Sequence, residues 1–144
     1  MGKESYTLKF EGFWREGTER DMPQASGVFC VFDARMIFAT GAMKPEKLIY
    51  IGTAGNASKA LDNHPNKPDW KKHLKPGNHI CYSFARVPVD KMTRVMATLV
   101  HHHKPPENEQ YVKVFPFDRT HILLAGQVAT LGAFVTVKKS KSII

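Results

Sequence analysis

The segment Lys47–Leu61, KLIYIGTAGNASKAL, decides the fold, because it combines a strand, a turn and the start of a helix. The run LIYI is typical of a β-strand, and Gly52 ends it. Asn56 is a favoured N-cap residue, so a short helix, ASKALDNH, is predicted after it, and Pro65 ends that helix. A polar turn between a strand and a helix presents backbone and side chains to solvent, so we expect a functional site, active or lost, at this turn.

Short β-forming runs flank this segment on both sides. We expect strands at Tyr6–Trp14 (at a sheet edge), Gly27–Asp33, Arg35–Ala39, Lys47–Gly52 and His79–Val87, and strand-like structure in residues 111–117 and 121–139. Because most of these runs follow one another without an intervening helix, antiparallel pairing is expected.

The longest helix signal is VDKMTRVMATLVHHHK, residues 89–104. Pro88 suits the first turn of this helix, and Lys104-Pro105-Pro106 ends it. Spacings of three and four predict one stripe that faces the core, made of Val89, Met92, Met96, Leu99 and His103. One more helical turn is expected around Trp70–Leu74.

The order of these elements predicts an α+β fold, in which helices flank a small antiparallel sheet with extra N- and C-terminal strands. We expect one domain over residues 1–137 and a frayed basic tail at 138–144.

Composition narrows the class of protein. The chain has 144 residues, 42% of them hydrophobic, and no run is long or apolar enough for a membrane span or a signal peptide. Cys30 and Cys81 lie in strand-like runs and are predicted to be buried thiols in a reducing compartment, so we expect a cytoplasmic protein. The net charge of +8 favours a polyanionic partner, with nucleic acid as the first candidate.

Three short motifs occur in a suggestive order. Gly27-Val28-Phe29 precedes Tyr50-Ile51-Gly52 and a short helix, and Lys104–Asn108 follows a second helix. Over residues 27–108 this ordered set resembles the GIY-YIG nuclease domain. The resemblance implies a divalent-metal-dependent phosphodiester hydrolase, in which a Tyr helps to activate water, an Arg on the first helix contacts the phosphate and a Glu on the second helix holds the metal.

The chain departs from this family at three of five positions. Tyr50 and Asn108 match, whereas Phe29 replaces a Tyr, Ala60 stands where the Arg would fall and Met96 stands where the Glu would fall. Phosphodiester hydrolysis needs cations at the developing negative charge, and a hard divalent metal needs carboxylate oxygen. The departures therefore predict a scaffold without the full catalytic set.

Nearby residues are candidates to replace the missing groups. Lys59 precedes Ala60, but it points about 100° away around the helix and has no guanidinium fork. The candidate carboxylates are Asp90, Glu107 and Glu109, and Glu107 would have to fold back from beyond the helix end. We expect no cofactor, and Mg²⁺ or Mn²⁺ held by Glu107 only if the chain is active.

A basic, proline-rich stretch is the predicted nucleic-acid contact. Its lysines would neutralise phosphates and its tryptophan would stack on a base; these residues are Lys67, Trp70, Lys71, Lys72 and Lys75. The alternative is a solvated loop that Trp70 anchors to the core.

The triplet His101–His103 suggests metal binding, but consecutive helical residues fan out by about 100° each and cannot converge on one ion. At most one of the three belongs to a site, with His73 or His79 as a partner.

Three functions remain open from the sequence. The first is a catalytically degenerate GIY-YIG-like domain that binds nucleic acid, with DNA as the first candidate, without cleavage, and with Tyr50, Lys59 and Asn108 lining the remnant cleft. The second is an active metal-dependent endonuclease that uses Tyr50, Lys59, Glu107 and Asn108. The third is a protein-interaction subunit whose old cleft contacts a partner chain.

Overall fold

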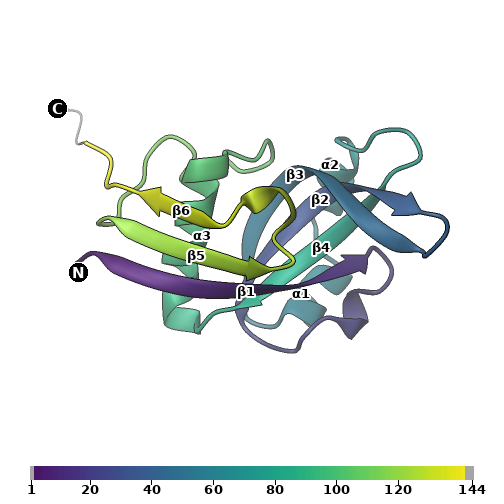
Figure 1. Ribbon diagram of the computed structural model, residues 1–144, viewed down its shortest axis with the longest axis horizontal. Helices are drawn as coiled ribbons and strands as arrows, with labels where there is room; N and C mark the ends of the chain where they lie inside the picture. The colour runs from purple at the N-terminus through teal and green to yellow at the C-terminus, as the bar shows by residue number, and fades with distance from the viewer. Residues whose placement is uncertain (1, 142–144) are drawn as a thin grey trace.

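A computed structural model describes residues 2–141, and within them six strands form one curled sheet in the order β3-β2-β4-β1-β5-β6 (Figure 1). The strands are β1 (Glu4–Arg15), β2 (Gly27–Ile37), β3 (Ala42–Ala54), β4 (His79–Arg86), β5 (Thr120–Gly126) and β6 (Phe134–Val137). The helices are α1 (Ala57–Asp62), α2 (Lys67–Lys71) and α3 (Val89–His103), with 3-10 turns η1 (Glu19–Asp21) and η2 (Ala129–Leu131). The prediction of a fold that mixes a β-sheet with helices is confirmed at this level.

The sheet topology differs from the prediction in two respects. β1 was predicted at a sheet edge, but it lies between β4 and β5. It pairs antiparallel with β4 and parallel with β5, so the sheet is mixed. The reason is that β5 follows β1 only after most of the chain, and a strand that returns from so far away can pair in either direction.

β2 and β3 form one long hairpin. The runs 27–33 and 35–39 were predicted as separate strands, yet β2 continues through Asp33 and pairs with β3 across two irregularities in register. The buried Asp33 carboxylate accepts a hydrogen bond of 2.9 Å from the Asn78 side chain, so the charge does not break the strand. β3 is an edge strand and therefore tolerates Pro45.

The helix boundaries follow the predicted signals closely. The Asn56 side chain accepts a hydrogen bond from the Lys59 backbone N–H at the start of α1, as an N-cap should. α3 ends at His103, and its C-cap residue Lys104 adopts a left-handed conformation (φ 49°) before Pro105. α2 was predicted around 70–74 and begins three residues earlier, at Lys67.

The buried face of α3 is not the predicted stripe. Val89 is 64% exposed, and Met92, Met96 and His103 are only half-buried, so Leu99 alone of that stripe is fully buried. The helix instead buries Arg94, Val95, Ala97, Thr98, Leu99 and Val100. Arg94 can be buried because its guanidinium donates to Thr120 Oγ1 and to backbone carbonyls before β5.

Two hydrophobic clusters cover the two faces of the sheet at β2. One cluster includes Val28, Cys30 and α3, and the other includes Phe29, Val31, α1 and Trp70. β2 is therefore apolar at every position from Val28 to Phe32, because both of its faces are covered. Cys30 and Cys81 are buried free thiols, as predicted, and burial raises the pKa of each to about 12.

The strands β5 and β6, and the part of β1 that pairs with β5 (residues 4–10), are covered on one face only. Their inward side chains, such as Leu8, Ile122 and Val135, join the cluster beneath α3. Outward side chains on the same strands, such as Leu123 and Phe134, are exposed. In Figure 1 these three strands lie in front of α3, and the side toward the viewer carries no helix.

The C-terminal segment is docked rather than frayed where the structure describes it. The backbone N–H of Ser140 donates to the Phe115 carbonyl (3.0 Å), and Phe115 N–H donates to Ser140 Oγ (2.8 Å). Residues 111–117 were predicted as strand-like but are irregular, and the tail residues 142–144 lie outside the described residues. Across residues 2–141, no helix has the length and apolar character to cross a membrane.

Candidate functional site

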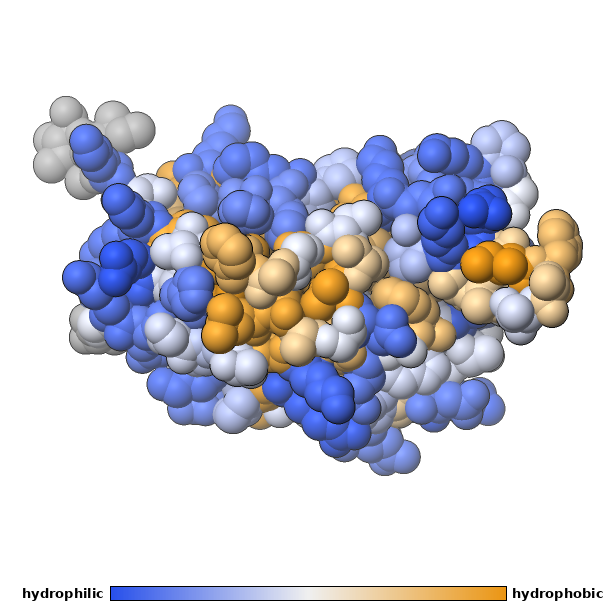
Figure 2. All heavy atoms as spheres, viewed as in Figure 1, coloured by the Kyte–Doolittle hydropathy of each residue, from blue (hydrophilic) through white to orange (hydrophobic). Residues whose placement is uncertain are grey.

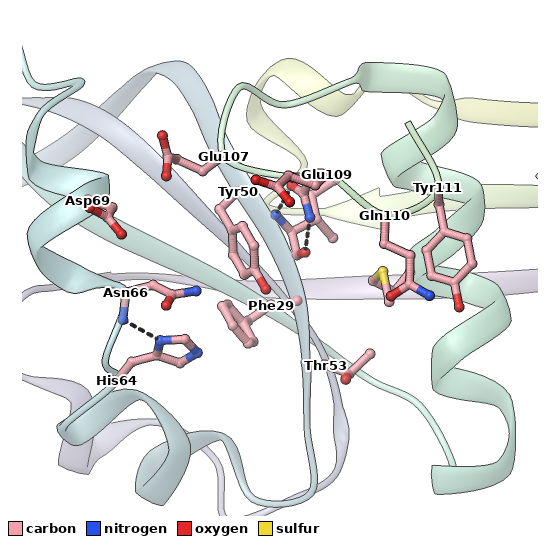
Figure 3. Close-up of a pocket in the computed structure, with 14 residues that line it drawn as sticks. Phe29, Tyr50, Thr53, His64, Asn66, Asp69, Glu107, Glu109, Gln110 and Tyr111 are labelled. Carbon is pink, nitrogen blue, oxygen red and sulfur yellow. Dashed lines mark hydrogen bonds between the residues drawn. The ribbon is translucent and has the colours of Figure 1, made fainter. Parts of the chain in front are cut away.

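A pocket of about 430 Å³ lies beside the edge strand β3, between α2 and α3 (Figure 3). Its wall is formed by residues from β2, β3, the loop between α1 and α2, α2, α3, and the chain that follows α3: Phe29, Tyr50, Ile51, Gly52, Thr53, His64, Asn66, Asp69, Met96, Glu107, Asn108, Glu109, Gln110 and Tyr111. Tyr50 occupies the middle of the view, with His64 and Asp69 on the α2 side and Gln110 and Tyr111 on the α3 side.

Residues 105–111 close one side of this pocket because they run along β3. Glu107 N–H donates to the Ile49 carbonyl at 3.1 Å. The Asn108 side chain makes two hydrogen bonds to Ile51: it accepts from the Ile51 N–H at 2.9 Å and donates to the Ile51 carbonyl at 2.8 Å. An edge strand otherwise leaves such groups unpaired, so Asn108 holds the pocket wall in place.

Aromatic rings form the base of the pocket. The Tyr50 ring lies 5.4 Å from Trp70 and 5.9 Å from Phe29, and the His64 ring lies 4.7 Å from Trp70, centroid to centroid. Burial raises the pKa of Tyr50, so its hydroxyl keeps its proton at neutral pH. Tyr50 is therefore a hydrogen-bonding group here, and no cation among the described residues favours its anion.

His64 is held as a neutral imidazole. Its Nδ1 accepts a hydrogen bond from the Asn66 backbone N–H at 3.1 Å, so the proton of the neutral ring lies on Nε2. Burial, and then the nearby Lys67 charge, lower its pKa. The ring can donate one hydrogen bond from Nε2.

The positions singled out by the family resemblance do not all reach this pocket. Phe29, Tyr50, Met96 and Asn108 line it. Ala60 does not: it packs against the cluster that contains Trp70 and Leu61.

Lys59 is exposed on α1 and is absent from the lining, and within residues 2–141 no Lys or Arg lines the pocket. The pocket thus offers no cation to a phosphate.

Three carboxylates line the pocket instead. Asp69 pairs with Lys72 at 3.2 Å, and Glu107 Oε2 lies 2.6 Å from His73 Nε2. Glu109 has no ion-pair partner among the described residues. Glu107 therefore does fold back toward the cleft, as the active alternative requires, but it does so in a pair with His73.

These donors do not fit a hard divalent metal. Among the residues that the structure describes, no three His, Cys, Asp or Glu side chains lie close enough to share an ion. Met96, at the position of the family's Glu, presents a thioether, and Mg²⁺ and Mn²⁺ prefer oxygen ligands.

The predicted basic contact surface is largely neutralised. Each of its four lysines has a carboxylate partner: Lys67 with Glu19 (2.8 Å), Lys71 with Glu16 (2.9 Å), Lys72 with Asp69 (3.2 Å) and Lys75 with Glu46 (3.9 Å). Lysines paired in this way have less charge to offer a phosphate.

Lys67 and Trp70 have structural roles. Lys67 and the Tyr82 hydroxyl both donate to the buried Glu19 carboxylate (2.8 and 2.9 Å). Burial alone would raise the pKa of Glu19, but these hydrogen bonds hold it below its usual value. Trp70 has no exposed surface, so the prediction that its ring stacks on a base is wrong, and the alternative, an anchor to the core, describes it.

The three histidines at the end of α3 do not converge on one point, although the rings of His102 and His103 lie 4.7 Å apart, centroid to centroid. His101 Nδ1 lies 2.9 Å from the Tyr111 carbonyl, whereas His103 is half-buried, and burial lowers its pKa to about 4. Neither His73 nor His79 joins them in a metal-binding group within the described part of the chain.

Several pocket residues carry no signal in the sequence. His64 and Asp69 lie close together in the chain, whereas Tyr111 is far from both and lines the same pocket only because residues 105–111 return to β3. Searches of family models, curated proteins and solved structures found no match to this chain.

Proposed function

We propose that the chain is a GIY-YIG-like domain that binds nucleic acid through basic surface outside the pocket and does not cleave it. The observation that supports the family resemblance is the convergence of Phe29, Tyr50, Met96 and Asn108 on one pocket, although they come from four separate parts of the chain. A resemblance carried by unrelated short motifs gives no reason for such convergence.

The chemistry of the pocket argues against cleavage. Phe29 has no hydroxyl, Met96 has no carboxylate, and Ala60 does not line the pocket. Hydrolysis of a phosphodiester requires positive charge at the equatorial oxygens, and the described pocket wall carries three carboxylates and no Lys or Arg. The active alternative, with Tyr50, Lys59, Glu107 and Asn108, lacks its cation because Lys59 does not line the pocket.

The excess of positive charge lies elsewhere on the molecule. The net charge is +8, and within residues 2–141 the following cations take part in no ion pair: Lys3, Lys9, Arg15, Lys44, Lys47, Lys59, Lys104, Lys113, Arg119, Lys138, Lys139 and Lys141. Unpaired surface cations attract phosphates through counterion release, which supports binding without any catalytic group.

The test combines binding and cleavage. We expect fluorescently labelled DNA or RNA oligonucleotides to bind with an affinity that falls steeply between about 50 and 200 mM salt. Supercoiled plasmid incubated with Mg²⁺ or Mn²⁺ should remain intact. Nicking that Tyr50→Phe abolishes would show an active enzyme, and the absence of salt-dependent binding would overturn the proposal.

A second candidate, a protein-interaction subunit, is favoured by one observation. The pocket combines the rings of Tyr50 and Tyr111 with three carboxylates, a lining that suits a cationic side chain of a partner protein. Association with a basic polypeptide that Glu109→Gln weakens, with no nucleic-acid binding, would favour this candidate.

A further inference from the structure

The uncovered face of β1, β5 and β6 has the features of a recognition surface. Figure 2 shows an apolar patch over β5 and β6 with hydrophilic residues around it. We call this surface the open sheet face and define it by the outward side chains of the three strands: Ser5, Thr7, Lys9, His121, Leu123, Ala125, Phe134 and Thr136.

The pairing of the strands arranges these side chains in rows. Thr7 pairs with Leu123, which pairs with Phe134. The next row joins Ser5, His121 and Thr136 in the same way. Because side chains alternate along each strand, both rows point away from α3.

Phe134, Leu123 and the His121 ring lie at the centre of the open sheet face. Phe134 is 65% exposed and Leu123 is 48% exposed. The His121 ring lies 6.2 Å from the Phe134 ring, at an interplanar angle of 36°. His121 Nδ1 is 2.5 Å from Thr136 Oγ1, which fixes the ring against the sheet.

Cations border this aromatic centre at both ends. At one end, Thr120 pairs with Glu4 on one side and with Val137 on the other. The residues next to these three along their strands therefore lie side by side at the margin of the face; they are Lys3, Arg119 and Lys138. All of these three cations are exposed, and none has an ion-pair partner among the described residues.

At the other end lies a hollow of about 420 Å³ lined by Thr7, Lys9, Glu11 and Arg86. Glu11 pairs with Arg86 at 3.1 Å, and Lys9 is unpaired within the described chain. Lys3 and Lys9 are six residues apart on β1, which corresponds to roughly 20 Å. The face and its margins therefore carry five cations and one carboxylate, with the exposed rings between them.

We propose that the open sheet face binds single-stranded nucleic acid, with a base stacked on Phe134 and His121 and phosphates contacting Lys3, Arg119 and Lys138 at one end and Lys9 at the other. The proposal rests on the proposed function, nucleic-acid binding, and adds to it the surface and the strandedness. Charge complementarity selects a polyanion, and the flat exposed rings select one whose bases are free to stack. A duplex keeps its bases stacked inside, so it offers the rings nothing.

The first test removes the central ring. Phe134→Ala should weaken binding of a fluorescently labelled single-stranded oligonucleotide by about 5- to 150-fold, as expected when one base–aromatic stack is removed. Phe134→Tyr keeps the ring and should bind like the wild type. Phe38→Ala is the matched control, because Phe38 is 91% exposed at the tip of the β2–β3 hairpin, away from this face.

The second test removes charge without touching the rings. The double variant Arg119→Gln/Lys138→Gln should reduce the slope of log affinity against log salt by roughly 0.7 for each phosphate that the protein no longer neutralises. Lys71→Gln/Lys72→Gln is the matched control, because both of these lysines are already paired with carboxylates. Arg119 and Lys138 are exposed, so this variant tests the proposal even if Phe134→Ala fails to fold.

The outcomes separate this inference from the proposed function. If the wild-type protein binds neither single-stranded nor duplex oligonucleotides, both are overturned. Suppose instead that the wild-type protein binds, that Phe134→Ala and Arg119→Gln/Lys138→Gln bind as tightly as the wild type, and that Lys71→Gln/Lys72→Gln loses binding. In that case only the inference about the open sheet face is overturned. Tighter binding of duplex than of single strands, or a dimer in solution that Phe134→Ala dissociates, would also overturn it.

Discussion

At the scale of single residues, the glycines of the two motifs have a packing role that is independent of catalysis. A Cβ atom on Gly52 would lie 2.5 Å from the Phe29 ring and 2.8 Å from the Tyr50 ring. A Cβ atom on Gly27 would lie 2.0 Å from the backbone carbonyl oxygen of Ala85. Both strands therefore need glycine to pack, whether or not the pocket performs chemistry.

The two glycines should respond differently to compensation. We expect Gly52→Ala to lower the free energy of unfolding by about 1–3 kcal/mol because the new methyl group meets a ring. A smaller side chain, as in Phe29→Leu, should recover part of that stability in the double variant. Gly27→Ala should not be rescued by Phe29→Leu, because its clash is with backbone.

Urea unfolding of the single and double variants measures these effects as a double-mutant cycle. If the losses in unfolding free energy of Gly52→Ala and Phe29→Leu simply add in the double variant, the predicted contact between a Cβ atom on residue 52 and the Phe29 ring is contradicted.

At the scale of elements, the segment 105–111 acts as a cover for the edge strand β3. It is irregular, yet it satisfies backbone groups of β3 through Glu107 and Asn108. Asn108 matches the family resemblance, but its contacts here are with Ile51 backbone and not with a solvent-facing ligand position. Its first role is therefore to position the pocket wall.

Removal of this side chain should loosen the cover. Asn108→Ala removes two hydrogen bonds and leaves the Ile51 N–H and carbonyl without partners, so we expect a destabilisation of about 2 kcal/mol. Amide exchange at Ile51 should accelerate. Glu109→Ala, in the same segment but exposed, is the matched control and should have little effect. Equal exchange rates at Ile51 in the two variants would show that Asn108 does not hold the segment.

At the scale of the whole molecule, one part of the sheet is buried on both faces and another part is exposed on one face. β2 is covered on both faces, whereas β5, β6 and the part of β1 that pairs with β5 leave one face open. The charge is divided in a similar way: the lysines near α2 are paired with carboxylates, and unpaired cations border the open sheet face. Net charge alone did not reveal this division.

The fold should lose stability in mild acid because two histidines are half-buried. Burial lowers the pKa of His103 to about 4 and also lowers that of His64, whereas an unfolded histidine titrates near 6.5. As the pH falls from 6.5 towards 4, the unfolded chain binds protons that the folded chain does not, so the free energy of unfolding decreases.

Thermal unfolding at about pH 7 and about pH 5 checks this expectation. The melting temperature should be lower under the more acidic condition, and His103→Gln should reduce the difference. A pH-independent melting temperature in the wild type would contradict the burial of neutral His103.

Local signals in the sequence were sufficient for the elements whose causes are local. The Asn56 cap, the stop at Lys104-Pro105 and the apolar run of β2 each follow from neighbouring residues, so they were predictable. The two buried thiols follow from strand hydrophobicity in the same way. The α3 stripe was misassigned because Val89 is exposed and the helix buries a neighbouring face that includes Val95 and Leu99, and periodicity alone carries no information on where the partner surface lies.

What the sequence determined by itself is thus the helix signals, the buried strands and the positive charge. Only the tertiary structure decided that β1 is central, that Trp70 is an anchor, that carboxylates line the pocket and that the lysines near α2 are neutralised. The physical reason is that each of these depends on groups far apart in the chain. Strand pairing, ion pairing and burial are fixed by which segments meet in space, whereas propensity and periodicity report only on neighbours along the backbone.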